Sequence, residues 1–206
     1  MADAWIKFCG CTSLFDAMLA RDAGADAFGM IFAPSPRRIA SEAAQEIARR
    51  APGSIAPVAV FVNPQPADVD AALELFPNAL LQFSGDETPE FVGRYGERAI
   101  KAIHIDDRSA RIEERCERYP QALLLFDARQ DGMAGGTGRT FDWSQAAPIA
   151  AKRRLVVAGG LRSDNVGECV ERVRPFGVDV RTGIETDGRK DPQKMQAFVR
   201  AVREAR

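Results

Sequence analysis

The segment WIKFCGCT, residues 5–12, joins a five-residue apolar run to a short ending that contains one glycine. A run of this length is typical of a strand that is covered on both faces of a sheet. An open doubly wound sheet usually carries a glycine-rich GxGxxG loop directly after its first strand. Because that loop is missing after residue 9, the segment favours a closed parallel barrel over an open sheet.

Seven further runs rich in Val, Ile, Leu and Phe repeat this pattern. They occupy residues 26–32, 56–62, 79–83, 99–103, 122–127, 154–159 and 177–181. The stretches between them have helical spacing and open on residues that suit helix starts. These are Thr12 or Ser13, Ser41, Pro66, Thr88, Ser163 and Asp191. Eight strands, each followed by a helix, predict a parallel eight-stranded (β/α)8 TIM barrel. No linker interrupts the pattern, so residues 1–206 are expected to form a single domain.

The composition argues against several classes of function. With 28 basic and 29 acidic side chains, the net charge of −1 gives no electrostatic case for a nucleic-acid or membrane surface. No stretch approaches the ~18–20 apolar residues of a membrane span, and the N-terminus does not resemble a signal peptide. Four cysteines without a CxxC pair, and a single histidine at His104, predict no disulfide framework, no zinc site and a cytoplasmic location.

The C-terminal ends of the strands are where such barrels carry their chemistry. Side chains alternate along a strand, which predicts Lys7 and Cys9 inside the barrel and Ile6 and Phe8 toward the helices. Cys9 is then either a small buried filler or a reactive thiol at the barrel mouth. Asp127 closes the sixth run and is either a loop cap or a titratable group in a cleft.

Three loops after strands carry candidate binding residues. Gly135, Gly136 and Gly138 follow Asp127 and suit either a mobile lid or a plain flexible loop. The segments AGGL (158–161) and RTGIE (181–185) end the seventh and eighth runs, where backbone N–H groups can bind an anion or simply form tight turns. The residues concerned are Gly159, Gly160, Thr182 and Gly183. In SPRR (35–38), Arg37 either binds a substrate carboxylate through two N–H groups of its guanidinium or is a solvated loop arginine.

Taken together, the chain resembles the phosphoribosylanthranilate isomerase family of tryptophan biosynthesis. Collinear motifs run nearly from end to end, among them KFCGCT (7–12), SPRRI (35–39), LQFSGDE (81–87), LLLFDA (123–128), GGTGRTFDW (135–143), AGGL (158–161), RPFGVDVRTGIE (174–185) and GRKD (188–191). The resemblance implies an Amadori rearrangement of N-(5-phosphoribosyl)anthranilate, a small-molecule substrate, without a metal or organic cofactor.

The family's residue roles transfer by motif. The resemblance makes Cys9 the general base and Asp127 the general acid, and it places the anthranilate carboxylate on Arg37. The resemblance also implies that the substrate phosphate is bound by backbone N–H groups around Gly159, Gly160, Thr182 and Gly183. A thiolate can act as a base if cationic neighbours lower its pKa, and Lys7 is the candidate neighbour.

Three residues depart from the family pattern. Cys11 replaces an aliphatic residue and is expected to pack outward. Ser84 replaces a histidine, which removes a polar ring from the rim. Arg181 replaces a serine. Alternation places it on the same inward face of the strand as Asp179, where it could reach the phosphate or pair with an acid. These changes leave open a related sugar-phosphate isomerase or epimerase with a shifted substrate, or a catalytically silent barrel that binds phosphorylated metabolites. The sequence does not decide between a monomer and a homodimer.

Overall fold

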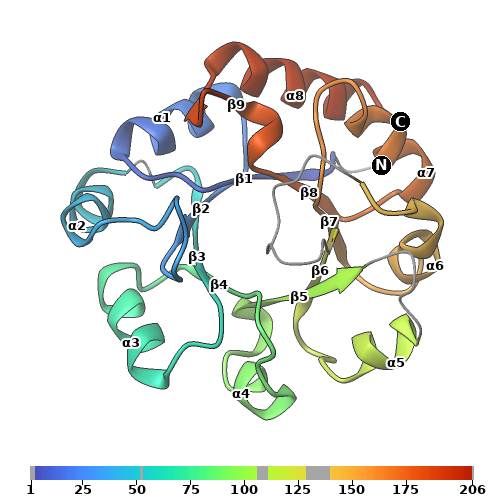
Figure 1. The fold of residues 1–206 in the computed structure, drawn as a ribbon, viewed down its shortest axis with the longest axis horizontal. Coiled ribbons are helices and arrows are strands. Elements are labelled where there is room, and N and C mark those ends of the chain that lie inside the picture. The colour runs from blue at the N-terminus through green and yellow to red at the C-terminus, as the bar shows by residue number, and fades with distance from the viewer. Residues whose placement is uncertain (1–2, 52, 106–110, 129–139, 206) are drawn as a thin grey trace.

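The computed structural model describes residues 3–51, 53–105, 111–128 and 140–205. Within them, eight parallel strands close into a barrel in chain order, and β1 pairs with β8 (Figure 1). The strands are β1 (Trp5–Cys9), β2 (Ala27–Ile31), β3 (Ala56–Phe61), β4 (Leu80–Phe83), β5 (Ala99–Ile105), β6 (Leu123–Ala128), β7 (Leu155–Val157) and β8 (Gly177–Val180). The predicted parallel barrel is confirmed.

Helices surround the barrel on its outer side (Figure 1). They are α1 (Leu14–Ala23), α2 (Ser41–Arg50), α3 (Pro66–Leu75), α4 (Pro89–Gly93), α5 (Ile112–Glu117), α6 (Ala147–Ala150), α7 (Val166–Val173) and α8 (Pro192–Glu204), with short 3-10 turns η1 (Gly96–Arg98), η2 (Trp143–Gln145) and η3 (Thr182–Ile184). No helix in the described part of the chain is both long and apolar enough to cross a membrane.

Most helix starts agree with the capping prediction. Ser13 caps α1 by accepting the Asp16 N–H, while the Asp16 carboxylate accepts the Ser13 N–H. The Thr88 and Asp191 side chains likewise cap α4 and α8. Ser41 is the first residue of α2, as predicted, although the N-cap position is Ala40 and no side chain caps the helix there. One predicted start is wrong. The α7 helix begins at Val166 rather than Ser163, because the Asn165 side chain accepts the Arg162 N–H and holds a turn there.

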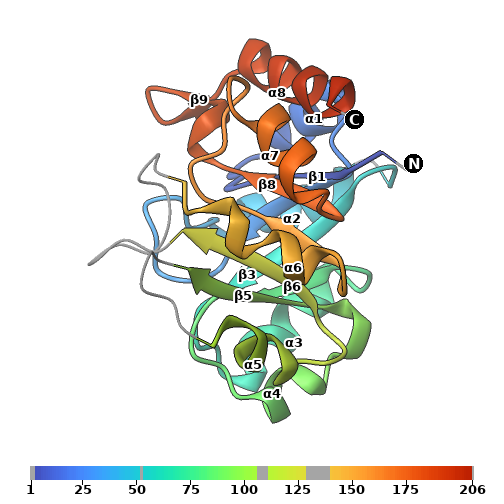
Figure 2. The same cartoon turned by 90° about the vertical axis from the view of Figure 1, so that its right-hand side faces the viewer.

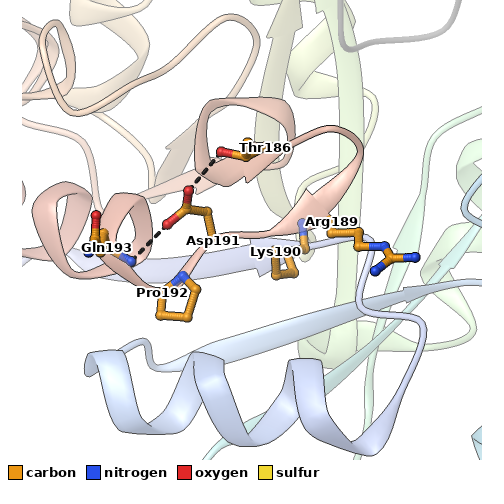
Figure 3. Close-up of a pocket in the computed structure, with 6 residues that line it drawn as sticks. All are labelled: Thr186, Arg189, Lys190, Asp191, Pro192 and Gln193. Carbon is orange, nitrogen blue, oxygen red and sulfur yellow. Dashed lines mark hydrogen bonds between the residues drawn. The ribbon is translucent and has the colours of Figure 1, made fainter.

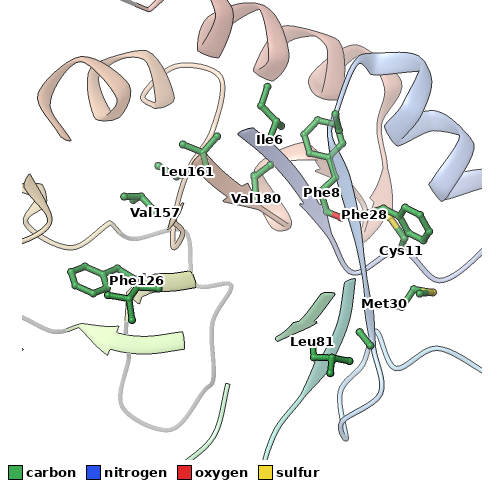
Figure 4. Packing of buried hydrophobic residues seen from close by; sticks show 14 of the residues in the cluster. Ile6, Phe8, Cys11, Phe28, Met30, Leu81, Phe126, Val157, Leu161 and Val180 are labelled. Carbon is green, nitrogen blue, oxygen red and sulfur yellow. Dashed lines mark hydrogen bonds between the residues drawn. The ribbon is translucent and has the colours of Figure 1, made fainter. Parts of the chain in front are cut away.

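Two apolar layers explain why the strands are apolar along their whole length. One layer fills the barrel interior and includes Cys9, Val58 and Leu125. The other lies between the strands and the helices and includes Phe8 and Cys11 (Figure 4). Because each strand is covered on both faces, successive side chains enter opposite layers. Cys11 is fully buried in the outer layer, as expected for a residue that packs outward.

A short antiparallel hairpin, β9 (Glu185–Thr186) and β10 (Arg189–Lys190), lies between β8 and α8. Figure 2 shows it at the end of the barrel toward which the strands point, whereas the N-terminus lies at the opposite end. This hairpin was not predicted from the sequence. It adds side chains to the mouth of the barrel where β1 ends.

Candidate active site

A buried ion pair lies inside the barrel below the mouth. Lys7 on β1 and Asp179 on β8 are partners in the strand register, and the Lys7 Nζ donates to Asp179 Oδ1 over 3.0 Å. Both side chains are buried. Burial is the largest influence on the pKa of Lys7 and acts to lower it, but Asp179 and Cys9 outweigh it, so that this pKa is raised. The pair therefore keeps Lys7 charged in the barrel interior.

Cys9 ends β1 directly above this pair. A Cβ built on Gly29 would lie 3.1 Å from the Lys7 Nζ and 3.2 Å from the Cys9 Sγ, so only a glycine on β2 leaves room for both. Burial raises the pKa of the thiol, and although Lys7 and Lys190 act to lower it, Asp179 adds to the rise. The predicted lowering by Lys7 is present but too small, because burial has the larger effect on this pKa and Asp179 also opposes Lys7. Cys9 is thus a thiol at neutral pH in the unliganded protein.

Asp127 lies at the end of β6, with β7 and β8 between it and β1. Burial raises its pKa to about 6, with Asp179 adding to the rise while His104, Arg181 and Lys7 oppose it. A carboxyl group with this pKa holds a proton often enough near neutral pH to donate it.

His104 is a site residue that the sequence analysis missed. The apolar run ends at Ile103, but β5 continues to Ile105, which places His104 on the inner face beside Asp127. Its Nε2 lies 2.8 Å from the Ser84 carbonyl oxygen. Ser84 removes one polar ring from the rim, and His104 supplies another from the neighbouring strand.

The hairpin contributes a second ionic cluster that the sequence analysis also missed. Arg37 donates from Nε to Glu185 Oε1 over 3.1 Å and from Nη2 to Glu185 Oε2 over 2.6 Å. The buried Lys190 Nζ lies 3.0 Å from the same carboxylate and also donates to the Cys9 carbonyl. These contacts keep the pKa of Glu185 below its ordinary value although burial, the largest influence, acts to raise it. The cluster ties the Arg37 loop and the hairpin to the end of β1.

Asp191 fixes this hairpin against the start of α8. It accepts the Thr186 hydroxyl over 2.7 Å and the Gln193 N–H over 2.9 Å (Figure 3). Figure 3 also shows a pocket along the hairpin, which includes Lys190 and Pro192 in its lining. Asp191 thereby holds the neighbouring Lys190 in a position from which it reaches both Glu185 and the backbone of Cys9.

The predicted anion-binding residues lie in adjacent loops after β7 and β8. Gly159 and Gly160 have φ values of +83° and +65°, which side chains rarely adopt. A Cβ on Gly183 would come within 2.0 Å of the Leu161 carbonyl oxygen, so the two loops meet backbone to backbone. Thr182 and Gly183 form η3 there.

Arg181 and Arg37 approach each other over Gly10. A Cβ on Gly10 would lie 3.3 Å from the Arg181 side chain and 3.5 Å from that of Arg37. The aliphatic parts of two arginine side chains are thus brought to one side of the mouth. The predicted lid residues Gly135, Gly136 and Gly138 lie outside the described residues. In the described ranges, no group of three or more His, Cys, Asp or Glu side chains could hold a metal ion.

Comparison with known proteins gives a consistent result. The profile of the family described as N-(5′-phosphoribosyl)anthranilate (PRA) isomerase matches residues 6–201. The N-(5′-phosphoribosyl)anthranilate isomerase of Desulforudis audaxviator is 44% identical over 200 residues, covering 97% of this chain and 98% of that protein.

Two solved structures are similar over nearly the whole chain. The phosphoribosyl anthranilate isomerase of Thermotoga maritima has a TM-score of 0.88 at 34% identity, covering 98% of this chain and 99% of that one. A phosphoribosyl anthranilate isomerase in complex with reduced 1-(o-carboxyphenylamino)-1-deoxyribulose 5-phosphate has a TM-score of 0.84 at 33% identity, with the same coverage.

Proposed function

The chain belongs to the N-(5′-phosphoribosyl)anthranilate isomerase family, and from this premise we propose that it isomerises N-(5′-phosphoribosyl)anthranilate in tryptophan biosynthesis. The observation that carries the proposal is the placement of Cys9 and Asp127 on either side of the β7 and β8 loops. A phosphate bound by those loops would leave the ribose ring between a thiol and a carboxyl group. Both groups have pKa values above their ordinary range.

Asp127 is the proposed general acid. Its carboxyl group donates a proton to the ring oxygen of the ribose, and the C1–O bond breaks as the nitrogen lone pair forms an iminium ion at C1. The carboxylate that remains is favoured most by His104 and then by the positive charges of Arg181 and Lys7. Acid catalysis of this kind contributes roughly 10²–10⁴-fold in rate.

Cys9 is the proposed general base. The thiol first releases its proton to solvent water, and the resulting thiolate removes the C2 proton, which converts the iminium ion to an enolamine that tautomerises to the aminoketone. No electrons enter or leave the substrate, so the sequence of steps is redox-neutral. Because Lys7 is paired with Asp179, the positive iminium ion supplies the charge that stabilises the thiolate. The thiolate form of Cys9 is therefore most populated while the iminium ion is present.

Arg37 is proposed to bind the anthranilate carboxylate. Glu185 accepts from two of the five N–H donors of the guanidinium group, through Nε and Nη2. The opposite edge, formed by Nη1 and the second Nη2 hydrogen, has the fork geometry that suits a carboxylate. The phosphate is proposed to bind at Gly159, Gly160, Thr182 and Gly183, with Arg181 at the rim.

A fluorescence assay tests the proposed function. The purified protein should convert N-(5′-phosphoribosyl)anthranilate with loss of anthranilate-type fluorescence, and Cys9→Ala and Asp127→Asn should each lower kcat by ~10²–10⁴-fold. Full turnover in either variant would remove that residue from the mechanism. Rescue of a tryptophan auxotroph that lacks this step would show the activity in a cell.

Two further properties are part of the proposal. All four cysteines are free thiols, which suits a reducing cytoplasm. Residues 1–206 are proposed to form a single domain around this barrel.

A further inference from the structure

The Lys190 side chain connects three segments of the chain at the barrel mouth. It lies on β10, directly before the Asp191 that caps α8 (Figure 3). Its Nζ donates to the Cys9 carbonyl oxygen over 2.5 Å and to Glu185 Oε1 over 3.0 Å, and it lies 3.5 Å from the Arg181 carbonyl oxygen. These three acceptors match the three N–H donors of an ammonium group.

Burial makes these contacts of Lys190 important. Only 2% of its side chain is exposed, and only 5% of that of Glu185. A buried ammonium group is costly unless it is paired and hydrogen-bonded. The pairing with Glu185 is local, because the two residues are register partners in the hairpin. The contact with Cys9 is not local, since it reaches across 181 positions of the chain to the end of another strand.

The carbonyl group of Cys9 determines how the backbone of the proposed base is oriented. Its direction is set by rotation about the Cα–C bond of Cys9, and a hydrogen bond to the oxygen restricts that rotation. Cys9 is the last residue of β1, and Gly10 follows it with a φ of +75°. Because glycine permits many backbone conformations, the peptide group between the two residues can rotate unless a further contact holds it. Lys190 provides that contact.

The Arg37 guanidinium is held without help from Lys190. Arg37 donates to both oxygens of Glu185, from Nε over 3.1 Å and from Nη2 over 2.6 Å. Lys190 shares only the first of these oxygens. Removal of the ammonium group therefore leaves both hydrogen bonds of Arg37 in place, so that the effect of Lys190 on Cys9 can be separated from the orientation of Arg37.

We propose that Lys190 is a positioning residue for Cys9, which fixes the peptide group after the proposed base and so holds the Cys9 side chain in position to reach the substrate. This inference rests on the proposed function, since it concerns the placement of the base. Proton removal needs the base within hydrogen-bond reach of the C2 proton, and a displacement of about 1 Å can cost ~10²-fold in rate. Loss of Lys190 should therefore slow turnover rather than weaken substrate binding.

Lys190→Met and Lys194→Met form a matched pair of variants. Both replace an ammonium group by an unbranched apolar side chain. Lys194 Nζ donates to the Glu185 carbonyl oxygen over 2.7 Å, so it anchors the same hairpin from α8. Lys190→Met should lower kcat about 10–100-fold and change KM by less than about threefold, because Arg37 keeps its hydrogen bonds to Glu185. Lys194→Met should keep the kcat of wild type.

NMR spectroscopy reports on the contact directly. The carbonyl carbon-13 signal of Cys9 should move upfield in Lys190→Met, because the carbonyl loses a charged donor, and it should stay in place in Lys194→Met. In wild type, a scalar coupling between the Lys190 ammonium nitrogen and the Cys9 carbonyl carbon shows the hydrogen bond without any substitution. The test therefore does not depend on a variant that folds. Urea unfolding of both variants verifies their stability.

Each outcome decides the proposal. Wild-type kcat in Lys190→Met overturns it, as does the absence of the coupling in wild type. An equal loss of kcat in Lys194→Met overturns it too, because both lysines would then only anchor the hairpin. A raised KM with unchanged kcat in Lys190→Met would mean that Lys190 acts through Arg37 instead. If wild type does not isomerise the substrate, the proposed function fails, whereas the coupling and the shifted Cys9 signal would still support the positioning of Cys9.

Discussion

Lys7 Nζ and Asp179 Oδ1 lie 3.0 Å apart with both charges enclosed in the barrel. Removing one partner of such a pair leaves the other charge buried without compensation, which is far costlier than losing an exposed ion pair. The same pair also affects the chemistry above it, because burial raises the pKa of Cys9 and Asp179 opposes the lowering effect of Lys7. Stability and reactivity at the end of β1 therefore depend on one ion pair.

Asp179→Asn should lower the free energy of unfolding by about 3–5 kcal/mol, because the ammonium group of Lys7 loses its counter-charge. Urea unfolding at neutral pH measures the loss. The matched control is the exposed pair of Arg50 and Glu46 on α2, 2.7 Å apart, where Glu46→Gln should change the free energy of unfolding by less than about 0.5 kcal/mol. An equal loss in both variants would contradict the role given to burial.

Alkylation of Cys9 should be slow at neutral pH and should accelerate as the pH rises past 9, since only the thiolate reacts and the pKa of this thiol is raised. Iodoacetamide labelling followed by peptide mass spectrometry measures the rate at Cys9 alone. Burial raises the pKa of Cys11 and Cys169 to about 12 and that of Cys116 to about 11, so these thiols serve as internal controls. Fast labelling of Cys9 at pH 7 would show that the unliganded site already holds a thiolate.

Asp127→Asn should be more stable than wild type at neutral pH. The carboxyl group has a pKa of about 6 when folded and about 3.9 when unfolded, so the folded state binds more protons between these values. The stability of the wild type therefore falls as the pH rises from 4 to 6 and is constant above this range. Because Asp127 is partly exposed, we expect the free energy of unfolding of the variant to exceed that of wild type by about 1–3 kcal/mol at pH 7.5.

Urea unfolding at pH 5 and pH 7.5 tests this dependence. The advantage of Asp127→Asn should be larger at pH 7.5 than at pH 5. An advantage that does not depend on pH would mean that the substitution acts through packing rather than through the charge.

Glu185→Gln should raise KM about 10–100-fold with a smaller change in kcat. A charge-assisted pair of this kind contributes about 1.5–3 kcal/mol, and its loss frees the guanidinium of Arg37 from a fixed orientation. A double-mutant cycle with Arg37→Ala tests the connection, because the two losses should not add if Glu185 acts through Arg37. Additive losses would mean that Glu185 acts on substrate binding through Lys190 or the hairpin instead.

The barrel was predictable because its signals are local. Run length and alternation identify strands that are covered on both faces, and they place Lys7 and Cys9 on the inner face. His104 was missed for a local reason as well, since a polar residue ended the apolar run although the strand continues toward the open mouth. Polar residues are expected there, so the alternation of β5 could have revealed it.

The partners of the inner side chains were not predictable in the same way. Arg37 and Glu185 are 148 positions apart in sequence, and only closure of the barrel brings the hairpin beside the loop after β2. Likewise, the pKa of Cys9 is raised by burial first of all and depends on Asp179 as well as on Lys7. A cation near a thiol in sequence does not reveal whether an acid on another strand already balances it.

Gly183→Ala should impair phosphate binding because the added Cβ would lie 2.0 Å from the Leu161 carbonyl oxygen, which forces the β7 and β8 loops apart. Inhibition by inorganic phosphate should weaken and the KM of the substrate should rise, while the pH dependence of Cys9 alkylation stays as in wild type. The control is Gly93→Ala at the end of α4, where nothing lies within 4 Å of the added atom and alanine favours a helix. That variant should keep wild-type phosphate inhibition and gain up to ~1 kcal/mol of stability. If both variants bind phosphate equally well, the backbone contact between the two loops does not shape the anion site.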